Sequence, residues 1–464
     1  MDVLIVLGAL FFLMIMAYRG YSVILLSPIA AMGAVLLISP AIVAPAFNGI
    51  FMEKMVAFIK LYLPVFLLGA IFGKFIELSG FSKSIVTAII KLIGTEKAAL
   101  AIVIVCAILT YGGVSLFVVV FAVYPFAAEM FRQSDIPKRL IPGCIVLGGV
   151  TFTMDALPGT PQIQNIIPTS FFNTNTWAAP CLGIAGSIII FSAGMLYLEW
   201  ARRKAIVRNE GYGINLLNEP TPFLTKTLPS LWLAITPLVL VGASNFLLTY
   251  LIPHWYDRLT TIGFPGLSSP LQIEIDKLTA VWAVEGAMLI GIIFVLLTGF
   301  KDISGHLAGA CKTAAEGSVL AAVNTASLYG FGAVIASLPG FLVIAEALNK
   351  GITDPLVNAA ITVSALAGIT GSASGGMSIA LATMSDNFLI TAQHAGIPME
   401  VFHRVVAMAS GGMDTLPHNG VIITLLAVTG LTHRQSYKDI LAITIIKTLG
   451  AVAVIAIYLL TGLV

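Results

Sequence analysis

Residues 151–161 read Thr-Phe-Thr-Met-Asp-Ala-Leu-Pro-Gly-Thr-Pro, and residues 410–420 read Ser-Gly-Gly-Met-Asp-Thr-Leu-Pro-His-Asn-Gly. Both contain Met-Asp-x-Leu-Pro, and the aspartate of the second, Asp414, follows that of the first, Asp155, by 259 residues. Proline lacks a backbone N–H and glycine tolerates irregular backbone, so both stretches interrupt a helix. The same interruption is therefore expected twice in the chain, each time beside an aspartate.

The surroundings of both motifs are almost free of charge. Residues 140–198 carry one charged side chain, Asp155, and residues 405–432 carry one, Asp414. Over all 464 residues, 58% are hydrophobic and 10% are charged, and the mean hydropathy is +1.00. A soluble domain carries about 25% charged residues, and so few charges could not cover the surface of a water-soluble fold of this size. The sequence predicts an all-α polytopic membrane protein.

Composition also excludes several classes. The apolar runs are continuous rather than alternating, which excludes an outer-membrane barrel, and a net charge of +2 gives no electrostatic case for nucleic acid. A span needs about 20 apolar residues, so the chain has room for about 10–12 spans. The basic stretch around Arg202, Arg203, Lys204 and Arg208 is expected to face the cytoplasm. It divides the chain into a first membrane repeat (1–201), a cytoplasmic polar linker (202–228) and a second membrane repeat (229–464).

The two halves share more than the aspartate motif. The ordered matches are Gly69-Ala70 with Gly332-Ala333, Gly112-Gly113 with Gly375-Gly376, Ser115 with Ser378, and Ile136-Pro137 with Ile397-Pro398. Their spacing stays between 259 and 263 residues, which indicates an internal repeat. A repeat with broken helices at matching positions is typical of secondary transporters, whose binding site lies near the membrane midplane.

Two stretches rich in glycine and serine, residues 110–115 and 370–378, each lie between apolar arms that are short for ordinary spans. This pattern predicts hairpins that enter the membrane and turn back. Their backbone N–H groups and hydroxyls could bind an anionic substrate, and the alternative role is close helix packing by small residues. The candidate substrate-binding residues at these tips are Gly112, Gly113, Ser115, Ser374, Gly375, Gly376 and Ser378.

Asp155 and Asp414 are candidates for proton coupling, because a carboxylate inside a membrane segment costs about 2.5–3.5 kcal/mol and is rarely kept without a function. The alternative role is structural, with each aspartate capping the half-helix that follows. His418 is a third candidate, since histidine titrates near pH 6.5, and its alternative role is that of a polar turn residue.

Polar residues after each proline are the remaining candidates, because the free N–H groups of a half-helix start attract anions. They are Thr160, Gln162 and Asn165 in the first copy and Asn419 in the second. His394, His403 and His433 are expected to be solvated, and Arg139 and Arg404 are expected to extend their charged ends to the membrane surface. The sequence shows no nucleotide-binding loop, nucleophile motif or metal-ligand cluster, so we expect no enzyme activity, no cofactor and no metal.

Several segments together resemble a known family. They are Gly69-Ala-Ile-Phe-Gly73-Lys74, Tyr111-Gly-Gly-Val-Ser115, Asp155-Ala-Leu-Pro-Gly-Thr-Pro-Gln-Ile-Gln-Asn165, Gly371-Ser-Ala-Ser-Gly-Gly376 and Gly412-Met-Asp-Thr-Leu-Pro-His-Asn419. Over nearly its whole length the chain resembles the gluconate permease family of bacterial proton symporters, within the ion transporter superfamily. It is most similar to the branch labelled D-beta-hydroxybutyrate permease.

The resemblance implies two inverted repeats, re-entrant hairpins, a scaffold part with a mobile transport part and, in many members, a homodimer. It also implies uptake of a small hydroxy-carboxylate with protons across the bacterial inner membrane. Sugar-acid members carry a His-Gly-Phe-Leu-Pro-Pro-His-Pro-Gly type of segment where this chain has Met154-Asp155-Ala-Leu-Pro-Gly-Thr-Pro161. This departure favours a shorter acid such as 3-hydroxybutyrate over gluconate.

The sequence therefore predicts proton-coupled symport of a small hydroxy-monocarboxylate. One alternative is a proton symporter of gluconate or a related sugar acid. Another is sodium coupling, with Na⁺ held by oxygens at Ser374, Thr160 and Asn165. An alternative of another class is a passive channel, although no ring of charged residues marks a pore.

Overall fold

Helices make up almost all of the regular structure, as the composition predicts. A computed structural model describes residues 1–19, 21–94, 97–114, 116–213, 216–220, 228–264, 270–275, 277–417 and 419–464. Up to the polar linker its elements are α1 (Asp2–Tyr18), α2 (Val23–Ile38), η1 (Pro40–Ile42), α3 (Val43–Ala46), η2 (Phe47–Met52), α4 (Glu53–Leu78), α5 (Phe81–Ile93), α6 (Ala98–Tyr111), α7 (Leu116–Gln133), η4 (Lys138–Leu140), α8 (Ile141–Gly149), α9 (Phe152–Asp155), α10 (Ile163–Phe172) and α11 (Pro180–Val207).

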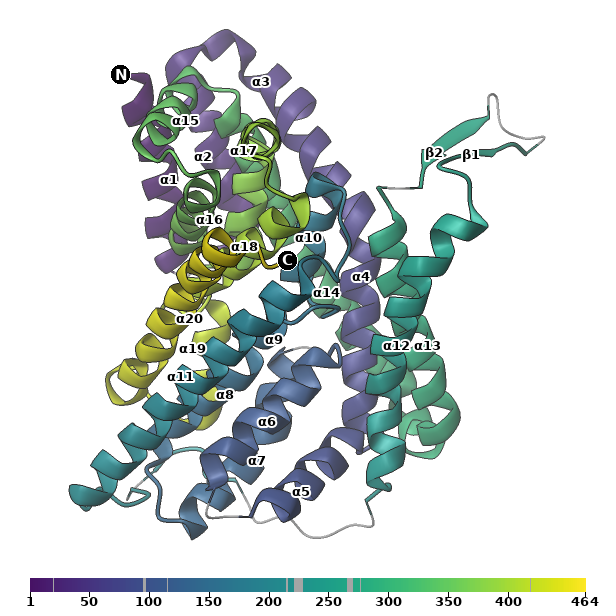
Figure 1. Ribbon diagram of the computed structural model, residues 1–464, viewed down its shortest axis with the longest axis vertical. Coiled ribbons are helices and arrows are strands. Elements are labelled where there is room, and N and C mark those ends of the chain that lie inside the picture. Colours follow the sequence, from purple (N-terminus) through teal and green to yellow (C-terminus); the bar gives the residue numbers. More distant parts are fainter. Residues whose placement is uncertain are drawn as a thin grey trace.

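The second part of the chain continues the bundle. Its elements are α12 (Leu231–Trp255), β1 (Leu259–Ile262), β2 (Leu271–Glu274), α13 (Thr279–Ile303), η5 (Ser304–His306), α14 (Leu307–Ala336), α15 (Pro339–Gly351), α16 (Pro355–Thr370), α17 (Ala373–Ala395), α18 (Met399–Gly412), α19 (Gly420–Thr429) and α20 (His433–Thr461). Figure 1 shows α9, α10 and α18 in the middle of the molecule, with α4 and α14 running beside them.

Five helical segments among the described residues are long and apolar enough to cross a membrane, judged by length and composition. They are Pro40–Leu78, Pro180–Val207, Leu231–Trp255, Thr279–Ala336 and His433–Thr461. Large apolar side chains such as Leu196, Trp232 and Leu297 lie exposed on them, as contact with lipid requires. The polytopic helical architecture is confirmed. The count of 10–12 spans, the re-entry of the hairpins and the inverted orientation of the repeats stay predictions.

Among the described residues, a short antiparallel sheet is the one departure from an all-helical description. In it, β1 pairs with β2 so that Leu259 lies opposite Glu274 and Ile262 opposite Leu271. Threonine and isoleucine, which favour strands, make up three of the four residues of β1 and one of the four of β2. Figure 1 shows this hairpin projecting away from the helices between α12 and α13. Its four-residue strands are too short to stand out from an apolar membrane sequence.

The order of elements repeats along the chain. A helical hairpin (α6–α7), a short helix with a break (α8–α9), a second short helix (α10) and a long helix (α11) recur as α16–α17, α18, α19 and α20. The two sets also pack against each other, because α10 contacts α17 and α18 while α19 contacts α7 and α8. This reciprocal packing supports the repeat seen in the sequence and places both breaks inside one shared core.

The hairpin tips turn through glycine. Gly113 follows α6 with a φ of +91°, and Gly371 follows α16 with a φ of +64°. Residues other than glycine rarely adopt these backbone angles. In the second hairpin Ser372 then caps α17, since its hydroxyl accepts a hydrogen bond from the Gly375 N–H. The tips thus form where the sequence predicts them.

The described part of the polar linker contacts both copies. Helix α11 continues to Val207, so the first residues of the predicted 202–228 linker are helical. Beyond it, the Leu217 carbonyl accepts a hydrogen bond from Lys138 Nζ (2.6 Å) and Asn218 Nδ2 donates to the Ala427 carbonyl (2.8 Å). The boundaries of the three regions stay predictions.

Candidate functional site

The first break holds its shape through threonine hydroxyls. Between α8 and α9 the helix is interrupted, and carbonyl groups lose their usual N–H partners. The hydroxyls of Thr151, Thr153 and Thr160 donate to the carbonyls of residues 147, 148 and 153, at 2.5, 2.8 and 2.7 Å. These bonds fix the single turn of α9, which ends at Asp155.

Asp155 forms an ion pair with a lysine of the other repeat. Its Oδ2 lies 2.5 Å from Nζ of Lys447 on α20, and the side chains are 0% and 1% exposed. Lys447 Nζ also donates to the Val150 carbonyl at 3.0 Å. Asp155 Oδ1 is buried and has no hydrogen-bond partner among the described residues. One carboxylate oxygen is therefore held by a cation, and the other is left unsatisfied.

Gly411 makes room for this ion pair. A Cβ at position 411 of α18 would lie 2.0 Å from both Asp155 Oδ2 and Lys447 Nζ, closer than van der Waals contact allows. The backbone of α18 therefore packs directly on the two charged groups. Because Asp414 follows Gly411 by three residues, the second break begins beside the ion pair of the first.

Arg404, also on α18, is a second buried cation, with 0% of its surface exposed. Its Nη1 donates to the Asp155 carbonyl (2.7 Å) and to Asn165 Oδ1 (2.9 Å). Its Nη2 and Nε donate to the Ala178 carbonyl at 2.7 and 3.2 Å. All of these acceptors are uncharged, and within the described chain no carboxylate oxygen contacts the guanidinium. The prediction that Arg404 reaches the membrane surface is wrong, because the Asp155 carbonyl at the first break, the Asn165 side chain and the Ala178 carbonyl before α11 hold it inside.

His403 lies beside Arg404 and is also fully buried. Its Nδ1 is 2.6 Å from the Thr174 hydroxyl and its Nε2 is 3.2 Å from Asn165 Oδ1. The prediction of a solvated His403 is therefore wrong, whereas His394 and His433 are exposed. Asn165 links the parts of the network, since its Nδ2 donates to the carbonyls of Thr160 and Thr176.

The unwound segment after Pro158 is tied to its neighbours on two sides. Gln162 Nε2 donates to the Thr110 carbonyl (2.7 Å) and the Tyr111 hydroxyl donates to the Pro158 carbonyl (2.8 Å), which joins the segment to the first hairpin. From α12, Asn245 Nδ2 donates to the Gly159 carbonyl at 3.1 Å. The segment therefore contacts its own hairpin and the first long helix of the second copy.

The second break is organised differently around Asp414. Its Oδ1 accepts hydrogen bonds from the backbone N–H of Ala373 (2.9 Å) and from Asn419 Nδ2 (2.8 Å). Asn419 Nδ2 also donates to the Gly371 carbonyl, and its Oδ1 caps α19 by accepting from the Val421 N–H at 2.7 Å. Asp414 thus binds the start of α17, which precedes it in the chain, whereas α19, the half-helix that follows it, is capped by Asn419.

The hairpin glycines lie in tight contacts. A Cβ would lie 2.5 Å from Leu238 at Gly112, 2.3 Å from Leu328 at Gly375 and 2.2 Å from Ala367 at Gly376. These contacts favour the packing role, and a role in substrate binding stays a prediction.

The tip serines differ in their surroundings. Ser374 Oγ lies 3.4 Å from Ser372 Oγ and 3.5 Å from Thr325 Oγ1. The hydroxyl of Ser378 is buried and has no hydrogen-bond partner in the described chain. Thr110 in the first tip stretch also has a buried hydroxyl without a described partner, so each tip stretch carries a hydroxyl with unused hydrogen-bonding capacity.

The structure brings the predicted residues into two neighbouring groups. Asp155, Thr160, Gln162 and Asn165 gather at the first break, and Asp414 and Asn419 gather at the second with Ser372 and Ser374 close by. Helix α20 contacts both, because Thr444 Oγ1 lies 2.5 Å from Thr415 Oγ1, one turn from Lys447. The predicted Ser115 and His418 lie outside the described residues.

Lys447 was not among the functional residues predicted from the sequence. This residue is the single charge in residues 440–464, and a lone lysine in such a run is itself a functional signal in membrane proteins. No pattern in the sequence shows that it pairs with Asp155.

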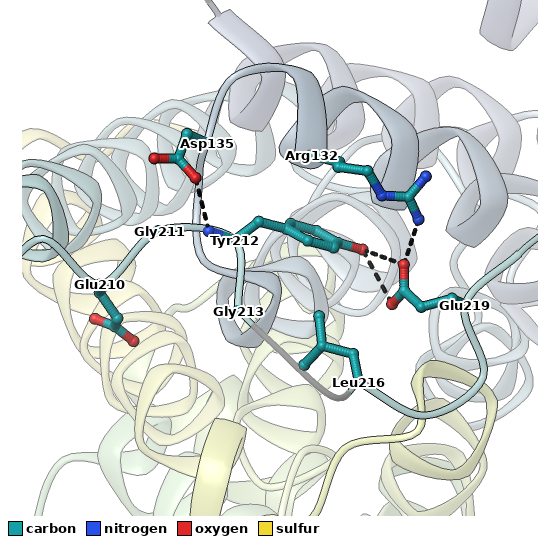
Figure 2. Close-up of a pocket in the computed structure, with 8 residues that line it drawn as sticks. All are labelled: Arg132, Asp135, Glu210, Gly211, Tyr212, Gly213, Leu216 and Glu219. Carbon is teal, nitrogen blue, oxygen red and sulfur yellow. Dashed lines mark hydrogen bonds and ion pairs between the residues drawn. The ribbon is translucent and has the colours of Figure 1, made fainter.

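A polar cavity of 640 Å³ lies away from the two breaks, at the linker. Figure 2 shows Tyr212 reaching toward Glu219, Arg132 bonded to the same carboxylate, and Asp135 accepting from the Tyr212 N–H. Beside it, Arg139 Nε donates to Glu210 at 2.6 Å, and this hydrogen bond holds the pKa of the Glu210 carboxyl below its ordinary value. These contacts hold the linker in place and do not connect to the buried network.

No group of three His, Cys, Asp or Glu side chains that could hold a metal occurs in the described ranges. The four cysteines are free, and Cys106 and Cys144 are buried.

Comparison with known proteins agrees with this architecture. The model of the GntP family permease matches residues 3–284. The chain is 56% identical over 472 residues, covering all of both sequences, to a Bacillus subtilis (strain 168) protein named Uncharacterized transporter YxjC.

Two solved transporters share the fold at 14% sequence identity. The YdaH transporter of Alcanivorax borkumensis matches with a TM-score of 0.53, over 89% of this chain and 88% of its own. MtrF of Neisseria gonorrhoeae, described as one of a class of antimetabolite efflux pumps, matches with a TM-score of 0.50, over 91% and 85%.

Proposed function

The chain belongs to the GntP family of permeases, and from this premise we propose that it is a secondary transporter that takes up a small hydroxy-monocarboxylate together with protons. We place it in the bacterial inner membrane as a multi-pass protein, in a homodimer of two inverted-repeat chains with re-entrant hairpins. The family and the transporter fold support the class of function. The substrate and the coupling ion rest on the site.

The observation that carries the proposal is the set of charges buried at the two breaks. Asp155 and Asp414 supply two acidic groups, and Lys447 and Arg404 supply two basic groups, all at most 7% exposed. Buried charges are expensive and are retained in membrane proteins mainly where ions or protons move. Arg404, held by uncharged oxygens, is the buried cation best able to attract an anionic substrate.

The substrate carboxylate would bind where helix starts and cations converge. Helix α10 begins at Ile163, and Gln162 before it makes no side-chain cap, so N–H groups of its first turn remain for an anion. Thr160, Gln162 and Asn165 border this start. On the second side, Ser374, Gly375, Gly376, Ser378 and Asn419 surround the start of α17, with Gly112, Gly113 and Ser115 at the first tip.

The proton would be carried by Asp155 or Asp414, with His418 as a third candidate. Both aspartates are buried and lie at the breaks. A change in the protonation of Asp155 would alter a contact between the two copies, and one of Asp414 would alter contacts within the second copy. The departure from the sugar-acid segment at 154–161 favours a short acid, for which 3-hydroxybutyrate is the test substrate.

The test is uptake of labelled 3-hydroxybutyrate into proteoliposomes with an inward proton gradient and without Na⁺, competed by unlabelled gluconate and lactate. Accumulation driven by the gradient and blocked by 3-hydroxybutyrate but not by gluconate supports the proposal. Accumulation that begins only when Na⁺ is added would show that uptake is coupled to sodium and not to protons. Stronger inhibition of uptake by gluconate than by 3-hydroxybutyrate would indicate that the substrate is a sugar acid.

Counterflow distinguishes a carrier from a passive channel. In a carrier, unlabelled substrate inside the vesicle accelerates entry of label, because the loaded protein returns faster than the empty one. Flux without counterflow would contradict the proposal of a symporter.

A further inference from the structure

The charged side chains around the first break add up to zero net charge, and this limits the charge of the substrate that can be transported. In the described structure the titratable groups near Asp155 are few. They are Lys447 on α20, Arg404 and His403 on α18, Asp414 beyond α18 and Tyr111 at the end of α6. Helices α6 and α8, which pack against α9, also carry the buried thiols of Cys106 and Cys144. With both aspartates ionised and both cations charged, the cluster has no net charge.

We propose, building on the proposed function, that protonation of Asp155 releases Lys447, and that the carboxylate of a monoanionic substrate replaces Asp155 as the counter-ion of Lys447 while also binding Arg404. The empty cluster is neutral. One added proton makes it singly positive, and one bound monoanion makes it neutral again. Transport is then one proton with one monoanion, and the loaded and empty forms carry the same buried charge.

The geometry of the ion pair supports this exchange. Asp155 is held through Oδ2 alone, at 2.5 Å from Lys447 Nζ, while Oδ1 has no hydrogen-bond partner among the described residues. The unpartnered oxygen offers a place for a proton. Lys447 Nζ keeps its bond to the Val150 carbonyl (3.0 Å) when Asp155 is neutral, so it remains at the break with its charge uncompensated.

Arg404 gives the substrate a second cation. Its donors contact the carbonyls of Asp155 and Ala178 and the amide oxygen of Asn165, and none of these acceptors neutralises its charge. Asn165 also borders the unwound segment proposed to bind substrate. A carboxylate arriving there would meet Arg404 from one side and the released Lys447 from the other.

The ion pair also joins the two copies, because Asp155 belongs to the first and Lys447 to the second. Gly411 of α18 lies against both groups, at a distance that excludes even a methyl group. Breaking the pair therefore loosens a contact between α9, α18 and α20. Protonation of Asp155 would in this way favour movement of these helices only when a bound substrate anion restores zero net charge in the cluster.

The experiment compares three purified variants with wild-type protein in proteoliposomes: Asp155→Asn, the doubly neutral Asp155→Asn/Lys447→Met, and Lys350→Met. Lys350 lies exposed on α15 and pairs with Glu346, so its replacement is the matched control for removing a paired lysine. Binding of labelled 3-hydroxybutyrate and counterflow are measured at about pH 6 and about pH 8, a range that spans the ordinary histidine pKa.

Asp155→Asn imitates the protonated state and keeps Lys447. We expect it to bind substrate with the same affinity at both pH values, to catalyse counterflow, and to lose accumulation driven by the proton gradient. The doubly neutral variant removes the counter-ion, and we expect its affinity to fall at least about tenfold while it remains folded, since uncharged replacements of a buried ion pair are tolerated. Lys350→Met should behave as wild type.

Wild-type uptake should also be unaffected by an imposed membrane potential, because one proton and one monoanion move no net charge. A dianion of similar size should be a poor competitor. Asp155→Asn that still accumulates substrate from the proton gradient, or a doubly neutral variant that binds as tightly as wild type, would overturn the inference. Wild-type protein that shows no gradient-driven uptake would instead overturn the proposed function, so the two failures are distinguishable.

Discussion

The Asp155 and Asp414 regions share four identical residues, those of Met-Asp-x-Leu-Pro, and the same kind of helix break, but their carboxylates bind different partners. Asp155 pairs with Lys447 at 2.5 Å and leaves one oxygen unsatisfied. Asp414 accepts from a backbone N–H and a side-chain amide. The local motif therefore determines where the chain breaks, and distant residues determine what the aspartate does there.

The difference begins in the long helices that follow each break. Lys447 lies within the apolar part of α20, whereas residues 180–198 of α11 carry no charged side chain. The second aspartate has no matching lysine from the first copy, and it binds the amide at the start of α17 instead. The duplicated motif therefore has a charged direct partner in the first copy and uncharged direct partners in the second.

Of the substitutions that test this comparison, replacement of Lys447 should lower the stability of the protein most. Lys447→Met leaves Asp155 buried without its counter-ion, and we expect the free energy of unfolding to fall by about 3–5 kcal/mol. Denaturant unfolding of the detergent-solubilised protein measures it. The doubly neutral Asp155→Asn/Lys447→Met should recover most of the loss, and a single variant as stable as wild type would show that the pair contributes nothing.

Gly411→Ala tests the packing of α18 on the pair. The new methyl group would lie 2.0 Å from both charged atoms, so we expect a loss of about 1–3 kcal/mol and reduced uptake. Gly420→Ala is the matched control, because nothing lies within 4 Å of a Cβ at the start of α19. Equal thermal stability of the two variants would contradict the close approach seen at Gly411.

Asp414→Asn should cost less than the loss of Lys447, about 1 kcal/mol, because an amide oxygen can still accept from the Ala373 N–H. In uptake assays this variant should keep its response to the proton gradient, whereas Asp155→Asn should lose it. Loss of coupling in Asp414→Asn and not in Asp155→Asn would reverse the roles assigned to the two breaks.

The exposed Arg139–Glu210 pair gives the smallest effect and a baseline for the buried one. The carboxyl of Glu210 is 34% exposed, so solvent limits its contribution to at most about 1 kcal/mol. Because the pKa of Glu210 is lowered, this stability is present above the ordinary glutamate pKa of about 4.3 and is lost as the pH falls through the lower folded value. Unfolding of Glu210→Gln at neutral and acidic pH should show a difference at neutral pH alone.

The sequence predicted the helical membrane class, the repeat, both breaks and both hairpin tips, because composition, proline and glycine act locally. It did not predict the pairing of Asp155 with Lys447, which lies 292 residues away in the chain. Arg404 and His403 were misplaced for a similar reason. Helix α18 is buried on nearly every side, and no pattern in the helix itself distinguishes a cation held by carbonyls from one that reaches water.

The separation of Asp155 from Lys447 also has a consequence for synthesis of the protein. At about 5–20 residues per second, a ribosome needs roughly 15–60 s to make the 292 residues that separate the two side chains. During that interval the segment with Asp155 has left the ribosome, but its counter-ion does not yet exist. The first break is therefore synthesised before its counter-ion, and the ion pair forms only after translation of α20.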